Sequence, residues 1–288
     1  MILQQVVSGL AVGCVYGLVA LGFVLIFKAT EVINFAQGEM MMLGAFIAFT
    51  LITMVHLPWA LAFFLTPVIC GGIGVILERV VIRPLVKESV ISIIMVTIGL
   101  SITLRAFAGM IWSYDTLDFP HVFSGKAVQI GPMILAPIYI WVICITVALV
   151  LFLYVFFRFT TLGISLQAAA QSPLASLLMG ISVKRVYSMT WAISGAMGAI
   201  AGILIAPIAF LNCNMGLLGL KAFPAAVIGG FNSIPGAIAG GLIIGVSENL
   251  AGGYLPVGFK DVFAYGVMLL VLMIRPEGIF GTHAKKKM

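Results

Sequence analysis

The sequence predicts an all-α integral membrane protein with about eight transmembrane segments, one or two of them broken or re-entrant. Of its 288 residues, 62% are hydrophobic and only 8% are charged, whereas a soluble globular domain carries about 25% charged residues. Apolar runs of membrane length recur along the whole chain, without the strict alternation of β-barrel strands. A mean hydropathy of +1.24 agrees with both observations.

The apolar segments occupy most of the chain and leave no room for a soluble domain. They cover residues 5–27, 35–55, 58–82, 89–111, 136–157, 187–209, 222–251 and 261–274. The first segment lacks the basic flank and the small-residue cleavage site of a signal peptide, so we expect it to form the first transmembrane helix. Residues 1–288 are therefore expected to form one transmembrane domain.

The basic residues indicate how the chain is oriented. The formal net charge is +6, and the lysines and arginines gather at the ends of apolar runs, which the positive-inside rule explains better than nucleic-acid binding does. Residues 79–88, 158–186 and 285–287 are then expected in the cytoplasm, and residues 112–135 outside. The chain must cross the membrane an even number of times after residue 186, so one of the last three apolar segments is not a simple span.

The longest of these three segments is expected to contain two helices. Pro224 suits the start of a helix, and Gly229 and Gly230 interrupt that helix well before it could cross the membrane. Asn232 and Ser233 can cap a second helix. Broken backbone at membrane depth is tolerated where protein or a water-filled cavity surrounds it, and in transporters it often marks the substrate pathway. An interfacial turn between two ordinary helices is an equally open alternative.

A polar cluster lies between the first two apolar segments, in the stretch "TEVINFAQGEMM". Asn34 and Gln37 have the spacing of an N-cap residue and its third helical position, and Glu39 follows near the positive end of the helix dipole. The turn before this helix, 28–33, is either interfacial or lies inside the membrane, with the helix start facing a cavity. Glu39 favours the second interpretation, since an ionisable residue at membrane depth normally faces protein or water.

Two further ionisable residues lie within apolar runs. Arg105 is expected to extend toward the external loop rather than to line a pathway. Glu248 lies near a helix end, and we expect it to pair with a basic residue or to lie at an interface. A gating role for Glu248 is the less favoured alternative.

The cytoplasmic stretch 158–186 is expected to contain two short helices. The first covers about 164–170 and includes Gln167 and Ala168. Ser172 is a good N-cap for the second helix, with proline following it, and Gly180 suits its C-terminal cap.

The second short helix has an apolar face, which we expect to be a docking surface for a cytoplasmic protein. Leu174, Leu177 and Leu178 share this face. The alternative is that the stretch lies on lipid, but its middle carries no charge that would attract anionic lipid.

Motifs for catalysis, nucleotide binding and metal binding are absent from the sequence. It contains no G-x-x-x-x-G-K-[ST], no H-E-x-x-H and no G-x-S-x-G. Its three histidines are scattered, and its four cysteines fit neither a zinc site nor a disulfide framework. We therefore expect no catalytic residue, no metal and no cofactor in this chain.

Several motifs together resemble one known family. "GLAVGCVYGLVALGFVLIF", "VINFAQGEMMMLGAF", "ERVVIRPLV", "TTLGISLQAAAQSPLASLLMGISVKRV", "KAFPAAVIGGFNSIPGAIAGGLIIGVSENL" and "RPEGIFG" follow one another as in the permeases of bacterial branched-chain amino acid ABC importers. The resemblance covers nearly the whole chain and is greater to the shorter, H-type Liv subunit of the permease pair.

This resemblance implies a bacterial inner-membrane complex. The chain would pair with a second, homologous permease as a heterodimer. Two cytoplasmic ATPase subunits would bind ATP and Mg, and a periplasmic protein would deliver the substrate. Residues 163–181 would couple the permease to the ATPases. The resemblance places the translocation pathway near the motif with Asn34, Gln37 and Glu39 and near the break at 229–236, which includes Gly229, Gly230 and Asn232. Glu248 is a further pathway candidate, because it is an ionisable residue within an apolar run.

The chain departs from the family pattern at two positions. Many relatives have histidine where this chain has Gln37, and an amide does not titrate as histidine does, so no proton-sensitive role is expected there. Gln167 stands where a charged residue is common, so no salt bridge is expected at that point.

Three functions are compatible with the sequence to different degrees. The leading hypothesis is a permease that moves small, branched-chain or other hydrophobic amino acids by alternating access; another small solute such as an amide, urea or an aromatic acid is the alternative cargo. A stand-alone secondary transporter would commonly need more helices and inverted repeats. An intramembrane enzyme lacks a nucleophile–base pair.

Overall fold

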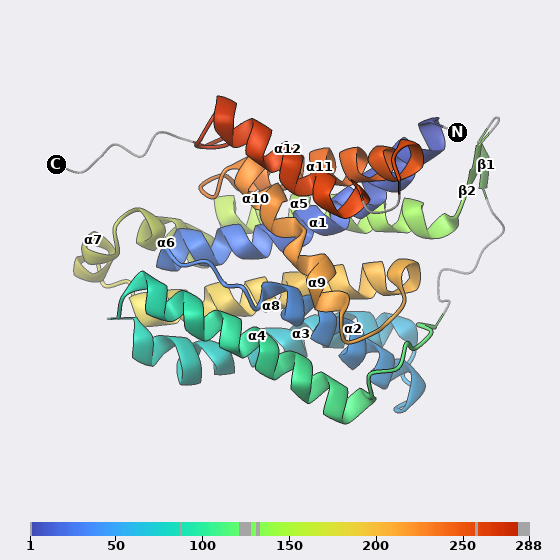
Figure 1. Cartoon of the computed structure of the whole chain (residues 1–288). Coiled ribbons are helices and arrows are strands. Elements are labelled where there is room, and N and C mark those ends of the chain that lie inside the picture. The colour runs from blue at the N-terminus through green and yellow to red at the C-terminus, as the bar shows by residue number, and fades with distance from the viewer. Residues whose placement is uncertain (1, 87, 121–127, 131–132, 257–258, 282–288) are drawn as a thin grey trace.

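The protein is a bundle of helices that run roughly parallel or antiparallel to one another (Figure 1). The computed structural model describes residues 2–86, 88–120, 128–130, 133–256 and 259–281. Part of the stretch expected outside the membrane, and the three lysines expected inside, lie beyond the described residues.

Helices dominate the structure. Their bounds are α1 Ile2–Thr30, α2 Gln37–Thr53, α3 Trp59–Leu77, α4 Val90–Trp112, α5 Pro137–Phe159, α6 Thr161–Gln171, α7 Pro173–Leu178, α8 Val183–Ala209, α9 Met215–Leu220, α10 Ala222–Gly229, α11 Ile234–Tyr254 and α12 Phe259–Ile274. A π-helical turn, Glu78–Ile82, and a 3₁₀ turn, Arg83–Leu85, continue α3. Two short antiparallel strands, β1 Val128–Ile130 and β2 Met133–Leu135, form the one sheet of the described chain.

Within the described residues, six helices are long and apolar enough to cross a membrane. They are α1, α3 with its continuation, α4, α5, α8 and α11. Three shorter apolar stretches accompany them: α2, α9 with α10, and α12. The prediction of a helical, multi-pass membrane protein is confirmed.

The predicted division of segment 222–251 into two helices is confirmed. α10 ends at Gly229, Gly230 has a left-handed φ of 93°, and the Ser233 hydroxyl caps α11 by accepting from the Gly236 N–H at 3.1 Å. α10 and α11 run in opposite directions, and their turn lies at one end of the bundle (Figure 1), as in the alternative of a turn between two helices. Pro224 occupies the third position of α10, since that helix begins at Ala222.

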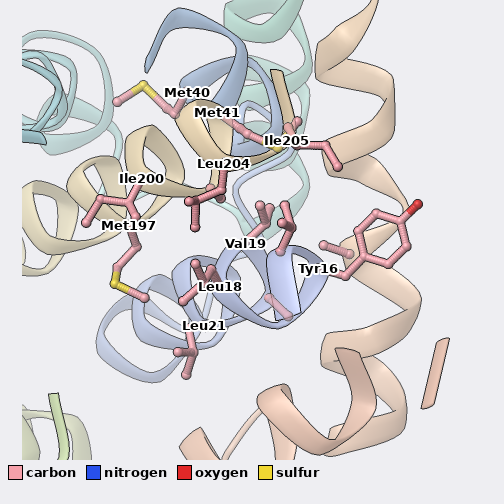
Figure 2. Close-up of a cluster of buried hydrophobic side chains, with 14 of the residues drawn as sticks. Tyr16, Leu18, Val19, Leu21, Met40, Met41, Met197, Ile200, Leu204 and Ile205 are labelled. Atoms are coloured by element: carbon pink, nitrogen blue, oxygen red, sulfur yellow. The ribbon is translucent and has the colours of Figure 1, made fainter. Parts of the chain in front are cut away.

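α1 lies in the centre of the bundle, between α11 and α8 (Figure 1). In its most apolar stretch of 18 residues, 83% is buried, whereas the corresponding share is 17% in α4 and 22% in α5. A helix that is apolar on all sides belongs in a protein interior or in lipid, and the burial figures separate these two cases. Side chains of α1, α2 and α8 meet in the core, among them Leu18, Val19, Met41, Ile200 and Leu204 (Figure 2).

Glycines allow α1 to approach α11 at backbone distance. A Cβ added to Gly13 would lie 2.8 Å from the Gly241 carbonyl oxygen, and one added to Gly9 would lie 2.9 Å from the Val246 Cα. Small residues at four-residue spacing permit such helix contacts in membranes, where close packing rather than hydrophobic exclusion drives association. The four-residue spacing of Gly9 and Gly13 therefore marks the face of α1 that packs on α11.

Gly13→Ala is expected to lower the melting temperature of the purified protein, because a side chain there must push α11 away and overpacking costs about 1–3 kcal/mol. Gly99→Ala on α4 is the matched control, since its Cβ would meet no neighbouring atom within 4 Å. Thermal unfolding in detergent measures both variants. Equal melting temperatures would contradict the close packing of α1 on α11.

Candidate functional site

The chain between α1 and α2 is unwound and enclosed by protein. Residues 31–36 form no helix, and Glu31 has a left-handed φ of 57°. The Thr97 hydroxyl on α4 accepts a hydrogen bond from the Phe35 N–H at 3.3 Å. Asn34 is buried at 1% exposure. The start of α2 therefore lies among other helices.

The expected capping of α2 by Asn34 and Gln37 is wrong. The helix begins at Gln37, and its N-cap residue, Ala36, makes no side-chain cap hydrogen bond. Asn34 Oδ1 accepts from the Ala36 N–H at 3.1 Å, and Asn34 Nδ2 is buried with no partner among the described residues. Local spacing suggested a cap, but a neighbouring helix binds the Gln37 side chain instead.

Gln37 joins three helices. Its Nε2 donates to the Ser194 carbonyl oxygen of α8 at 3.2 Å, and its Oε1 lies 2.8 Å from Ser194 Oγ. The same hydroxyl lies 3.1 Å from the Gly22 carbonyl oxygen of α1 and can donate its one hydrogen to either acceptor. Gln37 is fully buried, so this neutral network satisfies a polar amide where water cannot reach it.

Glu39 and Arg105 form a buried ion pair. The Arg105 guanidinium donates to Glu39 Oε1 through Nη2 and, at 3.2 Å, through Nε. Ser101 Oγ donates to the same oxygen at 3.3 Å. The expectation that Arg105 extends to the external loop is wrong, because a buried carboxylate needs a counter-charge. Glu39 Oε2 faces Gly216, where any Cβ would overlap the carboxylate.

Glu248 also has a basic partner, as expected. Lys221 Nζ donates to Glu248 Oε1 at 2.7 Å, and Tyr16 Oη donates to Glu248 Oε2 at 2.8 Å. Lys221 lies at the junction of α9 and α10, while Glu248 is on α11 and Tyr16 is on α1. This second buried pair therefore attaches the α9–α10 junction to the central helices.

Gly229, Gly230 and Asn232 lie apart from these polar clusters, at the turn between α10 and α11. The Gly229 carbonyl accepts from the Phe280 N–H at 3.3 Å. A Cβ on Gly230 would lie 2.8 Å from the Gly281 N. Asn232 is exposed. The break is therefore held by the segment that follows α12.

A row of aromatic rings connects the break with the unwound stretch. Phe223 of α10 lies with its ring centroid 5.8 Å from that of Phe35 and 5.7 Å from that of Phe231. Phe231 in turn lies 4.8 Å from Phe27 at the end of α1. Aromatic pairs at these separations attract one another beyond their burial, so movement of α10 would be felt at residues 31–36.

The two short helices predicted between α5 and α8 are confirmed as α6 and α7. The Ser172 hydroxyl accepts from the Ala175 N–H at 3.3 Å, and Gly180 ends the second helix with a φ of 82°. Gln167 Nε2 donates to the Phe157 carbonyl oxygen at 3.2 Å, and Ala168 beside it is half-buried. α6 is therefore held against α5, while α7 projects from one end of the bundle (Figure 1).

The projecting helix exposes apolar side chains. Leu174, Leu177 and Leu178 are 75%, 61% and 80% exposed. α7 lies at the same end of the bundle as the α10–α11 turn (Figure 1).

Comparison with known proteins decides the family. The profile of the family described as "Branched-chain amino acid transport system / permease component" matches residues 5–272. The chain belongs to this family. The permease is 33% identical to the high-affinity branched-chain amino acid transport system permease protein LivH of Escherichia coli K12, over 99% of its own length and 97% of that protein. It is also 33% identical to BraD of Pseudomonas aeruginosa, with the same coverage.

A solved structure shares the fold of the permease. A chain of PsaBC from Streptococcus pneumoniae in complex with Fab superposes with a TM-score of 0.52 at 15% identity, covering 96% of the permease and 92% of that chain. The family predicted from the motifs is thus confirmed by sequence, and the fold is similar to that of a solved protein.

Four interior partners carry no clear signal in the sequence. Ser194, Ser101, Tyr16 and Lys221 each bind a residue that had been singled out, but hydroxyls within apolar helices are common and carry no signal of their own. Lys221 could have been found, since it is a lone lysine between apolar stretches. Among the described residues, no group of three or more His, Cys, Asp or Glu is close enough to hold a metal ion.

A third ion pair, between Arg83 and the buried Glu78, lies on the continuation of α3, and Ser188 joins it to α8 in the permease. Arg83 binds the Glu78 carboxylate through Nε at 3.0 Å and Nη2 at 2.7 Å, and Ser188 Oγ donates to Glu78 Oε2 at 2.8 Å. This pair belongs to the motif "ERVVIRPLV". Its bidentate geometry and buried carboxylate indicate a structural attachment.

Arg105→Gln is expected to destabilise the permease more than Glu39→Gln does. The first change leaves a buried carboxylate without its counter-charge, which typically costs about 3–5 kcal/mol, whereas the second leaves a guanidinium that is already 27% exposed. The double variant should recover part of the loss. Melting temperatures of the four proteins measure the coupling; additive effects, within about 0.5 kcal/mol, would show that the pair has no energetic role.

Proposed function

We propose that the permease is one of two membrane-spanning subunits of an ATP-driven importer, and that it moves branched-chain or other small hydrophobic amino acids across the bacterial inner membrane by alternating access. The observation that carries this proposal is the family match along residues 5–272, together with relatives of nearly equal length whose names specify branched-chain amino acid transport. Amides, urea and aromatic acids are the alternative cargoes.

The proposed partners are a second, homologous permease, two ATPase subunits and a periplasmic binding protein. The permease has no nucleotide-binding motif of its own, so ATP and Mg would be bound by the ATPase subunits. α4 and α5 leave most of their apolar surface uncovered, which suits contact with lipid and with a second permease. The six long helices, together with crossings contributed by the shorter apolar stretches α2, α9–α10 and α12, give the about eight crossings that are proposed.

The α6–α7 segment is the proposed coupling element. Its exposed leucines form an apolar contact surface at the end where the charge pattern puts the cytoplasm. Because α6 is hydrogen-bonded to the end of α5, a push on α7 by an ATPase would be transmitted to a long helix.

The proposed translocation pathway runs beside the start of α2 and the α9–α10 junction. Both are interruptions of helical backbone within a helical bundle, which is where transporters commonly place substrate contacts. Asn34, Gln37 and Glu39 come from the first interruption. Glu248 is joined to the second through Lys221, and the α10–α11 turn, with Gly229, Gly230 and Asn232, would move with α10.

Reconstitution in liposomes tests the function. The permease with a second permease, ATPases and binding protein should accumulate radiolabelled leucine or isoleucine only when ATP is enclosed on the cytoplasmic side. Urea and acetamide should not compete. Uptake by the permease alone, driven by an ion gradient, would instead establish the secondary transporter.

Leu177→Asp is expected to reduce substrate-stimulated ATP hydrolysis at least about tenfold, because an unpaired charge in an apolar contact is costly. Leu177→Met at the same position keeps the contact apolar and is the control. Normal hydrolysis in a well-expressed Leu177→Asp complex would exclude α7 from coupling.

Asn34→Asp separates a pathway role from a purely structural one. Aspartate can still accept the hydrogen bond from the Ala36 N–H, so the local backbone should be kept, while a second carboxylate near Glu39 should reduce uptake at neutral pH. Mild acid should restore part of the uptake by neutralising the added charge. Parental uptake across the pH range, with Asn34→Ala lowering only the melting temperature, would contradict the pathway role.

A further inference from the structure

An apolar groove of about 510 Å³ runs between α3, α5 and α8. Its walls include Phe64 and Val68 of α3, Leu149 and Phe156 of α5, and Met197 and Ile200 of α8. All three helices are among the six that are long enough to cross a membrane. Phe64 and Val68 on its wall are exposed, so the groove opens at the outer surface of the bundle.

A second hollow, of about 370 Å³, continues the groove toward α6. Phe156 lines both spaces. The second hollow is also bordered by Ser165 of α6 and by Ser182 and Arg185 at the start of α8. Arg185 is exposed and forms no ion pair within the part of the chain that the structure describes.

One face of α8 forms the floor of both spaces. Residues at positions 185, 189, 193, 196 and 200 line them in turn, with the three- and four-residue spacing of a single helix face. From Arg185 to Ile200 the face is about 22 Å long at 1.5 Å per residue. Half of a bilayer that is about 40–45 Å thick, headgroups included, is of the same length.

We propose that this groove binds one anionic phospholipid of the inner leaflet, with the phosphate at Arg185 and an acyl chain along α8 as far as Ile200. The groove is lined by an arginine and hydroxyl groups at one end and by apolar side chains at the other, over the length of one leaflet. A phospholipid has the same order of a charged headgroup followed by apolar acyl chains. Arg185 lies at the end of the bundle that the charge pattern assigns to the cytoplasm. This inference goes beyond the transport function and does not depend on which substrate is carried.

The bound lipid would contact the coupling element. Leu162 and Ser165 of α6 border the headgroup end, whereas the exposed leucines of α7 do not line it. Lipid and an ATPase would therefore occupy different faces of the α6–α7 segment.

Native mass spectrometry of the full-length permease, titrated with phosphatidylglycerol or with phosphatidylcholine, tests the headgroup site. Arg185→Gln should weaken phosphatidylglycerol retention roughly fivefold, since a basic residue near an anionic surface contributes about 1 kcal/mol. It should leave phosphatidylcholine retention unchanged. Lys184→Gln, an exposed neighbour that does not line the hollow, should behave like the parent. Equal loss in both variants, or none in Arg185→Gln, would overturn the headgroup assignment.

Ala196→Trp tests the acyl-chain site by filling the groove. Retention of both lipids should fall, while Ile102→Trp on α4, at a residue that is 64% exposed, should have no effect. A cysteine at position 196, in a background without the four native cysteines, should react with a maleimide-bearing lipid. Cross-linking of that cysteine to another protein subunit in membranes, in place of lipid, would overturn the proposal.

Discussion

The backbone contact between α1 and α11 is the constraint on which the rest of the bundle depends. Glycines on both helices remove the side chains that would separate them, and α1 is thereby covered on the side opposite α8. Because α1 is apolar on all sides, it can pack against other helices in every direction. The remaining helices can then be arranged around it, with α2 and α8 closing the core and α3, α4 and α5 outermost.

Buried polar groups attach the interrupted helices to this central pair. Gln37 ties the start of α2 to α1 and α8, Glu39 ties it to α4, and Lys221 ties the α9–α10 junction to α1 and α11. Such groups are costly to leave unpaired in a low-dielectric interior. They therefore specify where the ends of the short helices lie. Apolar packing alone would specify these positions less well.

One end of the bundle carries both the proposed coupling element and the proposed lipid site. At one end, α7, the α10–α11 turn and the start of α8 lie together (Figure 1), so the proposed ATPase contact and lipid groove share α6 and α8 as support. The aromatic row from Phe27 to Phe223 leads from this end toward the unwound stretch before α2. A displacement at the coupling end thus has a packed route to the interior polar residues.

The sequence by itself determined that the protein is helical and membrane-embedded, because composition and membrane-length apolar runs leave few alternatives. It also determined the break at Gly229 and Gly230, the cap at Ser172 and the glycine contact face, since each depends on local backbone chemistry. Only the tertiary structure decided where polar side chains point. Gln37 was expected to cap a helix terminus, and Arg105 was expected to extend to the external loop. Each instead binds a residue from a distant helix, because satisfying a buried polar group outweighs a weak local preference.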